Sequence, residues 1–210
     1  MKKAIIALLV VVMAFLSFQK YQEHTEIELL TRAISDTTAR ASTTLDILRG
    51  GHRVPIADFI KQTEAHNQAL SNHIISIKSN IGSKRHVETA FAISYIEQTA
   101  IVFRSATKLS RTIIEARLAK DKLNKTIATL QNFVNNPGND RARYAANMED
   151  SDAVSQRVDI AKADFDVAIL QFQLDLTDLS SIKPPNKSKI PATAILSAND
   201  FKDIEITLFK

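Results

Sequence analysis

The sequence predicts an all-α protein: an elongated antiparallel four-helix bundle preceded by an N-terminal hydrophobic anchor helix, with a short extended C-terminal tail. Apolar residues recur at spacings of three, four and seven through most of the chain, which is typical of amphipathic helices. The four glycines and five prolines of the 210 residues all fall between these periodic segments, where they suit helix ends. Long amphipathic helices joined by short turns pack as an antiparallel bundle.

The N-terminal segment, residues 1–20, is interpreted as a retained membrane anchor; a cleaved signal segment and a buried core helix are the alternatives. Ala4–Phe18 contains fifteen residues without a charge, between paired lysines and Lys20. Fifteen helical residues cover about 22 Å of a roughly 30 Å hydrocarbon layer, but flanking lysines extend to the interface. The lysines before the segment favour a cytoplasmic N-terminus. The expected location is the cytoplasmic (inner) membrane, single-pass, with the bulk of the chain extracytoplasmic.

Two amphipathic helices are expected in the first half of the bundle domain, residues 21–183. The first has an apolar face at Ile27, Leu30, Ile34, Ala41, Leu45 and Leu48. Gly50 is suited to close this helix in the left-handed conformation, and Pro55 to begin the next. The second has an apolar face at Ile56, Ile60, Leu70, Ile74, Ile77 and Ile81, with Thr63 and Asn67 in two less suitable positions.

The third and fourth helices complete the predicted bundle. The third is expected from about Val87 to Val134, with an apolar face at Leu109, Ile113, Ala116, Leu123, Ile127, Leu130 and Val134 that Lys120 interrupts. The fourth has its face at Val154, Val158, Ala161, Phe165, Ala168, Phe172, Leu176 and Leu179. The stretch from Asp140 to Asp150 is ambiguous.

The remaining segment, residues 184–210, is expected to be a Pro-containing extended tail. Ile204, Ile206 and Leu208 alternate with more polar neighbours, which permits a short strand. Such a strand could dock a partner by edge addition.

The charges separate by helix. From Arg104 to Lys125 there are seven basic and two acidic residues, whereas from Glu149 to Ser180 there are eight acidic and two basic residues. Arg104, Lys108 and Arg111 share one face, which would suit nucleic acid or anionic lipid. We favour a structural interpretation, in which opposite charges on neighbouring antiparallel helices set their pairing. Nucleic-acid binding is not expected, because no aromatic residues interleave with the basic ones.

The sequence contains no recognisable catalytic or metal-binding motif. It has no cysteine, which excludes disulfides, thiolate metal sites and a cysteine nucleophile. His66 and His73 are two helical turns apart, about 10 Å, too far for one metal ion. Asp164 and Asp166 point to different faces of one helix. We interpret the histidines as solvated or turn residues; they are His24, His52, His66, His73 and His86. No catalytic, cofactor-binding or metal residue, no cofactor and no enzymatic activity is therefore expected.

Two stretches resemble the LemA family. The turn Arg49–Pro55 is similar to the family's basic turn, which runs into a helix-starting proline with a histidine, here His66, about three turns later. The helix Arg157–Gln173 is similar to the family's last helix. Its matching positions are Arg157, Val158, Ala161, Lys162, Asp164, Phe165, Ala168 and Phe172. The resemblance implies a membrane-anchored, elongated four-helix bundle without established catalytic activity.

The function expected from these observations is a membrane-anchored, non-enzymatic scaffold or adaptor in the bacterial cell envelope. An extracytoplasmic sensory or ligand-binding bundle that works with a separate transducer is the alternative, and a metal-dependent or hydrolytic enzyme ranks third. The expected partners are the cell membrane, through residues 4–18, and either other proteins or a second copy of the chain. No nucleic-acid partner is expected.

Overall fold

The computed structural model describes residues 2–50, 54–81, 87–135, 141–186 and 188–201. Its elements are the long helices α1 (Lys2–Leu48), α2 (Ile56–Ile81), α3 (Val87–Asn135) and α4 (Arg141–Ser181) and the short 3-10 helices η1 (Ala192–Ala194) and η2 (Ala198–Phe201). These described ranges contain no strand, which confirms the all-α class. The alternating residues of the predicted strand, 204–209, lie outside the described residues.

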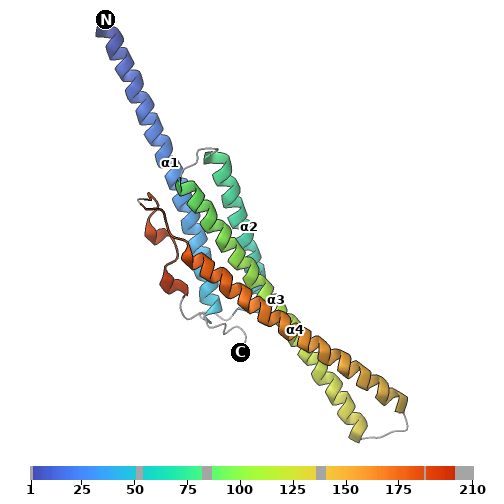
Figure 1. Cartoon of the computed structure of the whole chain (residues 1–210). Helices are drawn as coiled ribbons and strands as arrows, with labels where there is room; N and C mark the ends of the chain where they lie inside the picture. The colour runs from blue at the N-terminus through green and yellow to red at the C-terminus, as the bar shows by residue number, and fades with distance from the viewer. Residues whose placement is uncertain (1, 51–53, 82–86, 136–140, 187, 202–210) are drawn as a thin grey trace.

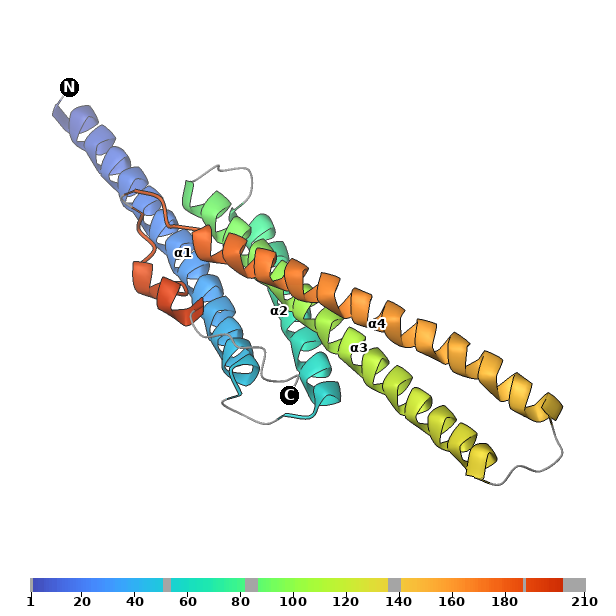
Figure 2. The same cartoon turned by 60° about the horizontal axis from the view of Figure 1, so that its bottom comes forward.

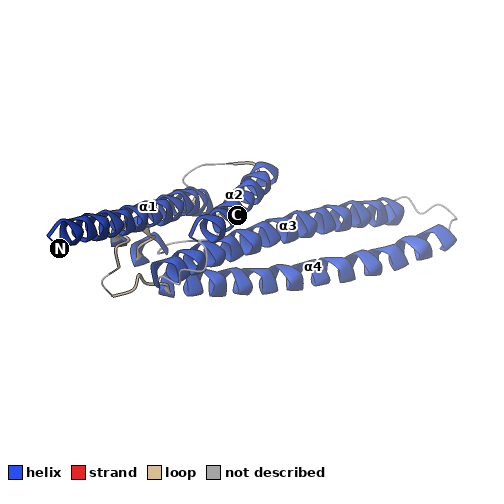
Figure 3. Ribbon diagram, turned by 90° about the horizontal axis from the view of Figure 1, so that it is seen from above, coloured by secondary structure: helices blue, strands red, loops and turns tan. Residues whose placement is uncertain are grey.

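Successive long helices run in opposite directions (Figure 1). The body of the molecule combines the second half of α1, all of α2, the first half of α3 and the last turns of α4. Beyond it α3 and α4 continue side by side as an arm (Figure 2), and the view from above shows the same pairing (Figure 3). The main buried core extends along α3 only to Ile113 and begins on α4 at Ala168. We call residues 114–135 and 141–165 the arm.

The predicted membrane anchor is not supported. Ala4–Phe18 forms the first part of α1, which continues without a break through Lys20 into the body. In the part of the chain that the structure describes, no helix is long and apolar enough to cross a membrane. The prediction of a transmembrane, single-pass protein of the inner membrane is therefore wrong. The physical reason is length, since fifteen uncharged residues cover only about 22 Å of helix.

The apolar faces predicted for the first and fourth helices are confirmed. On α1, Leu30, Ile34, Ala41, Leu45 and Leu48 are buried and Ile27 is half-buried. On α4, Val154, Ala168, Phe172, Leu176 and Leu179 are buried, and Val158, Ala161 and Phe165 are half-buried. Gly50 has a φ of 80°, as the left-handed end of a helix requires. The ambiguous residues 141–150 belong to α4.

The predicted face of the third helix is wrong at two positions of its outer half, while Ala116, Leu123 and Leu130 are half-buried as predicted. Ile127 and Val134 are 41% and 65% exposed, respectively. After Ile114, the half-buried positions of the arm on α3 are Ala116, Ala119, Leu123, Thr126, Leu130 and Phe133. Their alternating spacing of three and four is that of a coiled-coil seam. The predicted face and the observed seam share Leu123 and Leu130. The observed seam, which faces α4, includes Ala119 in place of Lys120, and Lys120 is exposed.

Several buried hydroxyl groups inside the helices donate to the backbone of the preceding turn. Thr37 Oγ1 donates to the Ala33 carbonyl at 2.8 Å, and Thr99 Oγ1 donates to the Tyr95 carbonyl at 2.8 Å. The same bond to the preceding turn is made by Thr44, Thr63, Thr107 and Ser110. Because each of these six hydroxyls finds a partner four residues back, it is buried without an unpaired donor. Thr89 Oγ1, near the start of α3, is the exception among the described residues, since it is buried without a partner.

The segment after α4 packs against the body, which corrects the prediction of an extended tail. Ile190, Ala194 and Leu196 are buried, and η1 and η2 both contact α1. A chain of three hydrogen bonds fixes it. The Leu196 N–H donates to Tyr95 Oη at 3.2 Å, and Thr38 Oγ1 donates to the Ala194 carbonyl at 2.7 Å. Since the Thr38 proton is used in that bond, the 2.8 Å contact between the two hydroxyls is a bond from Tyr95 to Thr38.

Burial of the Tyr95 ring raises the pKa of its hydroxyl, against the smaller opposing effects of its bonds to Thr38 and Leu196. The phenol is therefore neutral at physiological pH and keeps the proton that it donates. This bond joins α3 to α1, and the neighbouring bonds join both helices to the tail.

Candidate functional site

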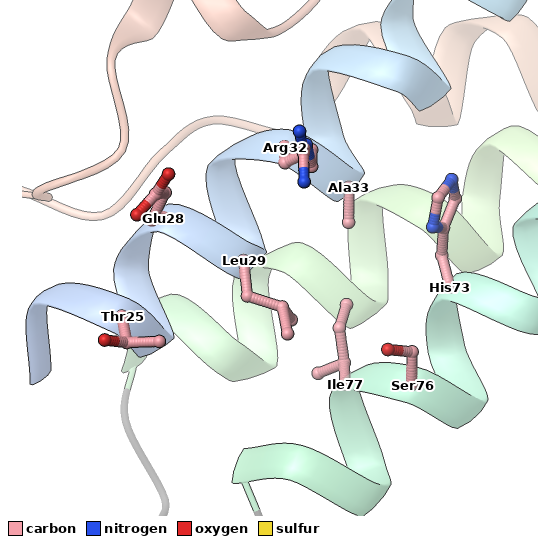
Figure 4. A pocket seen from close by; sticks show the side chains of 8 residues that line it. All are labelled: Thr25, Glu28, Leu29, Arg32, Ala33, His73, Ser76 and Ile77. Carbon is pink, nitrogen blue, oxygen red and sulfur yellow. The ribbon is translucent and has the colours of Figure 1, made fainter. Parts of the chain in front are cut away.

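A cavity of about 410 Å³ opens between α1 and α2 (Figure 4). It is lined by Thr25, Glu28, Leu29, Arg32, Ala33, His73, Ser76 and Ile77. The α1 residues follow one another at spacings of one, three or four, so they share a face of that helix, and the α2 residues do the same. Leu29 and Ile77 supply the apolar lining, while Glu28, Arg32 and His73 bring ionisable groups. The cavity therefore suits a small molecule with an apolar body and a polar end.

A hydrogen-bonded group stands beside this cavity. His73 Nε2 lies 2.7 Å from Asp36 Oδ2, and Arg40 Nε donates to the same oxygen at 2.7 Å. The bond from Arg40 holds the pKa of Asp36 below its ordinary value; burial opposes this effect, and the bond from His73 adds to it. The carboxylate is thus ionised at neutral pH, and it fixes the orientation of His73 at the edge of the cavity.

The predicted placement of the histidines in solvent or turns is wrong for His66. Its side chain is buried on α2, with its ring centroid 5.4 Å from that of Phe103 and its Nδ1 3.4 Å from Thr44 Oγ1. Because Thr44 already donates to a backbone carbonyl, the His66 Nδ1 carries the proton in this contact. Desolvation, and after it the charge of Arg40, lowers the pKa of His66.

Three histidines remain besides His66 and His73. His24 is exposed, and His52 and His86 lie outside the described residues. Among the residues that the structure describes, no cluster of three or more histidine, cysteine or acidic side chains could hold a metal ion.

The basic face of α3 lines a second cavity, of about 300 Å³, together with residues of α2. Arg104, Lys108 and Arg111 all contribute to it, and Arg111 Nη2 lies 2.6 Å from Glu64 Oε1 on α2. None of the ion pairs between described residues joins α3 to α4. The predicted pairing of the two helices by opposite charge therefore finds no support in ion pairs between described residues and stays a prediction. Their seam consists of small and apolar side chains, which leaves the charges outside.

The other face of α4 carries large apolar side chains that are open to solvent. Ile160, Val167, Leu170 and Leu174, which we call the outer stripe, are each at least 60% exposed. On the side that packs against α3, by contrast, Phe172 is fully buried. Sequence reasoning missed the outer stripe, although the spacings of seven, three and four between its members are visible in the sequence. The buried face has the same kind of spacing, so periodicity alone does not distinguish the two.

Three comparisons with known proteins found no match. No protein-family model matches the chain, and neither a curated protein nor a solved structure matches it.

Proposed function

We propose that this protein is a non-enzymatic adaptor or scaffold that binds a partner protein through the outer stripe of α4. The observation that carries the proposal is a helix with two apolar faces, of which one packs on α3 and the other is open to solvent in the described structure. Single exposed apolar residues are common on protein surfaces, but aligned groups of large ones mark interaction sites. The length of α4 beyond the body makes this face accessible.

The resemblance to the LemA family supports the same proposal. Its more specific part, Arg157–Gln173, is the stretch of α4 that carries three of the four residues of the outer stripe. We take the body as an antiparallel four-helix bundle that the arm extends, in the manner that this resemblance implies. A divergent member of that family would be a helical scaffold without catalytic chemistry.

Site-specific cross-linking in cells tests this function. Benzoylphenylalanine is introduced at Val167, and for comparison at Leu118, which is 64% exposed on α3. We expect a heavier adduct from position 167 only, and its loss when Leu170→Asn and Leu174→Asn are added. If the chain stays uncross-linked at both positions, or if the adduct survives those substitutions, the outer stripe does not bind a partner.

A second candidate function rests on the cavity between α1 and α2. We propose as the alternative that it binds a small ligand and that a separate protein transmits the signal. Arg32 lines the cavity and is exposed, so Arg32→Ala should leave the fold intact. A ligand from a thermal-shift screen should raise the melting temperature of the wild type and raise that of this variant less. Equal shifts in both would place the ligand elsewhere, and an empty screen would count against the alternative.

A further inference from the structure

The outer stripe has the geometry of a coiled-coil seam. At 100° per residue its four side chains fall within about 80° of the helix circumference, and its centre lies about 160° from that of the face packed on α3. Ala163, which is also exposed, fills the gap between Ile160 and Val167. The positions 160, 163, 167, 170 and 174 then alternate by three and four, which is the a and d pattern of a heptad repeat. The seam is about 21 Å long.

Acidic residues flank this seam on both sides. With Ile160, Val167 and Leu174 at a, the e and g positions next to the seam are Asp159, Asp164, Asp166, Gln171, Gln173 and Asp178. All six side chains are exposed. None of the four carboxylates takes part in an ion pair with another described residue. The flanks therefore carry four negative charges that the rest of the described chain leaves uncompensated.

This charge pattern selects the occupant. If α4 of a second copy lay on the seam, aspartates would meet aspartates in the parallel and in the antiparallel orientation alike, and like charges at e and g oppose pairing. The basic helix α3 of a second copy does not fit either. Its solvent face carries Arg104, Lys108 and Arg111. Its exposed large apolar residues in the arm, Leu118, Ile127 and Val134, are nine and seven residues apart, which is not an a and d pattern.

We propose that the outer stripe binds an amphipathic helix of another protein, with aliphatic residues at its a and d positions and lysine or arginine at e and g. The two helices form a short coiled coil in which the partner's cations face the four aspartates. This inference rests on the proposed function and adds the chemistry of the partner. Apolar contact supplies most of the affinity, whereas the charges supply selectivity and salt dependence.

The test uses two synthetic peptides of about four heptads, each with isoleucine at a and leucine at d. One carries lysine at every e and g position, and the other carries glutamate there. Binding of each fluorescently labelled peptide to the full-length chain is measured by anisotropy. We expect the lysine peptide to bind at least about tenfold more tightly than the glutamate peptide, and to weaken as salt is raised.

Variants of the chain locate the binding. The double variant Leu170→Asn and Leu174→Asn should weaken the lysine peptide at least about tenfold, whereas Leu118→Asn, on α3, should leave it unchanged. The double variant Asp164→Lys and Asp166→Lys should remove most of the preference between the peptides, because the flanks then carry two positive and two negative charges. These side chains are exposed, so circular dichroism should show the same helix content and unfolding in all variants.

Several outcomes would overturn the inference. They are an absence of binding by the lysine peptide, equal binding of both peptides, or binding that the outer-stripe substitutions leave unchanged. Self-association that is detected by sedimentation and abolished by those substitutions would assign the stripe to a second copy instead. A cross-link at Val167 without peptide binding would overturn the inferred chemistry and leave the proposed function standing. Peptide binding without a cross-link in cells would leave the inferred chemistry standing and overturn the proposed function.

Discussion

Replacing Tyr95 by phenylalanine should release the segment that follows α4. The substitution keeps the ring, which is buried on α3, and removes only the hydroxyl. That hydroxyl accepts the Leu196 N–H at 3.2 Å and donates to Thr38 Oγ1 at 2.8 Å. The variant therefore loses one hydrogen bond between the body and the tail and one between α3 and α1, without opening a large cavity.

The expected cost follows from these two bonds. Each neutral hydrogen bond contributes about 0.5–1.5 kcal/mol, and a buried donor left without a partner costs about 1–3 kcal/mol. The amide of Leu196 becomes such a donor, because Leu196 is only 9% exposed. Because only the bond from Leu196 joins Tyr95 to the tail, the free energy that holds the tail against the body should fall by about 1–3 kcal/mol. Expressed as an equilibrium constant for tail opening, this is roughly 5- to 160-fold.

Hydrogen exchange at the Leu196 amide measures this opening directly, and urea unfolding followed by circular dichroism measures the effect on the whole fold. Thr38→Val removes the two bonds that Thr38 makes, to Tyr95 and to the Ala194 carbonyl. Its effect should be similar and should add incompletely to that of Tyr95→Phe, because the two variants share a bond. Tyr21→Phe, at a 70% exposed position, is the control and should change stability by less than about 0.5 kcal/mol. If exchange at Leu196 were the same in Tyr95→Phe and the wild type, the assignment of this bond chain would be wrong.

Three further predictions concern the core and its titrating groups. Phe172→Ala should lower the free energy of unfolding by about 3–5 kcal/mol in urea titrations, because the ring is fully buried between α4 and α3; Val167→Ala, at an exposed position of the same helix, should cost far less, and equal losses would contradict the assignment of faces. Burial lowers the pKa of His66. As the pH falls below about 6.5, the unfolded chain therefore binds a proton at this residue before the folded chain does, and the melting temperature should drop between pH 7.5 and 5.5. The drop should be smaller in His66→Gln, and identical pH profiles of the two proteins would refute the prediction. The lowered pKa of Asp36 stabilises the fold at pH values above 3.8, the ordinary pKa of this group. This contribution is lost as the pH falls through the folded-state pKa, so Asp36→Asn should lose less stability than the wild type between pH 5 and 3. A parallel loss in both proteins would count against the bonds from Arg40 and His73.

The helical elements could be predicted from local sequence because their signals are local. Gly50 closes α1 with a positive φ, and Pro55 precedes α2. The buried residues of α4, such as Ala168 and Phe172, follow the predicted face. The anchor prediction failed because an apolar segment was interpreted by composition, whereas the uncharged stretch is too short to span a membrane and continues as part of α1.

The candidate sites could not be predicted in the same way, because each depends on which elements meet. The cavity between α1 and α2 combines Arg32 with His73, which are far apart in the sequence. His66 lacks any local signal of burial; α3 covers it with Phe103, whose ring centroid lies 5.4 Å away. The tail could be placed against Tyr95 only once the bond from Leu196 was seen.

The sequence by itself determined that the chain is helical, where most helices end and that α4 carries apolar residues at heptad spacing on more than one face. Only the tertiary structure decided that the second of those faces stays open to solvent. The buried face holds Ala168 and Phe172, which pack on α3, and the exposed one holds Val167 and Leu170. The physical reason is that one helix neighbour covers one side of a helix. A second apolar face of the same helix therefore stays exposed to solvent unless another helix packs against it.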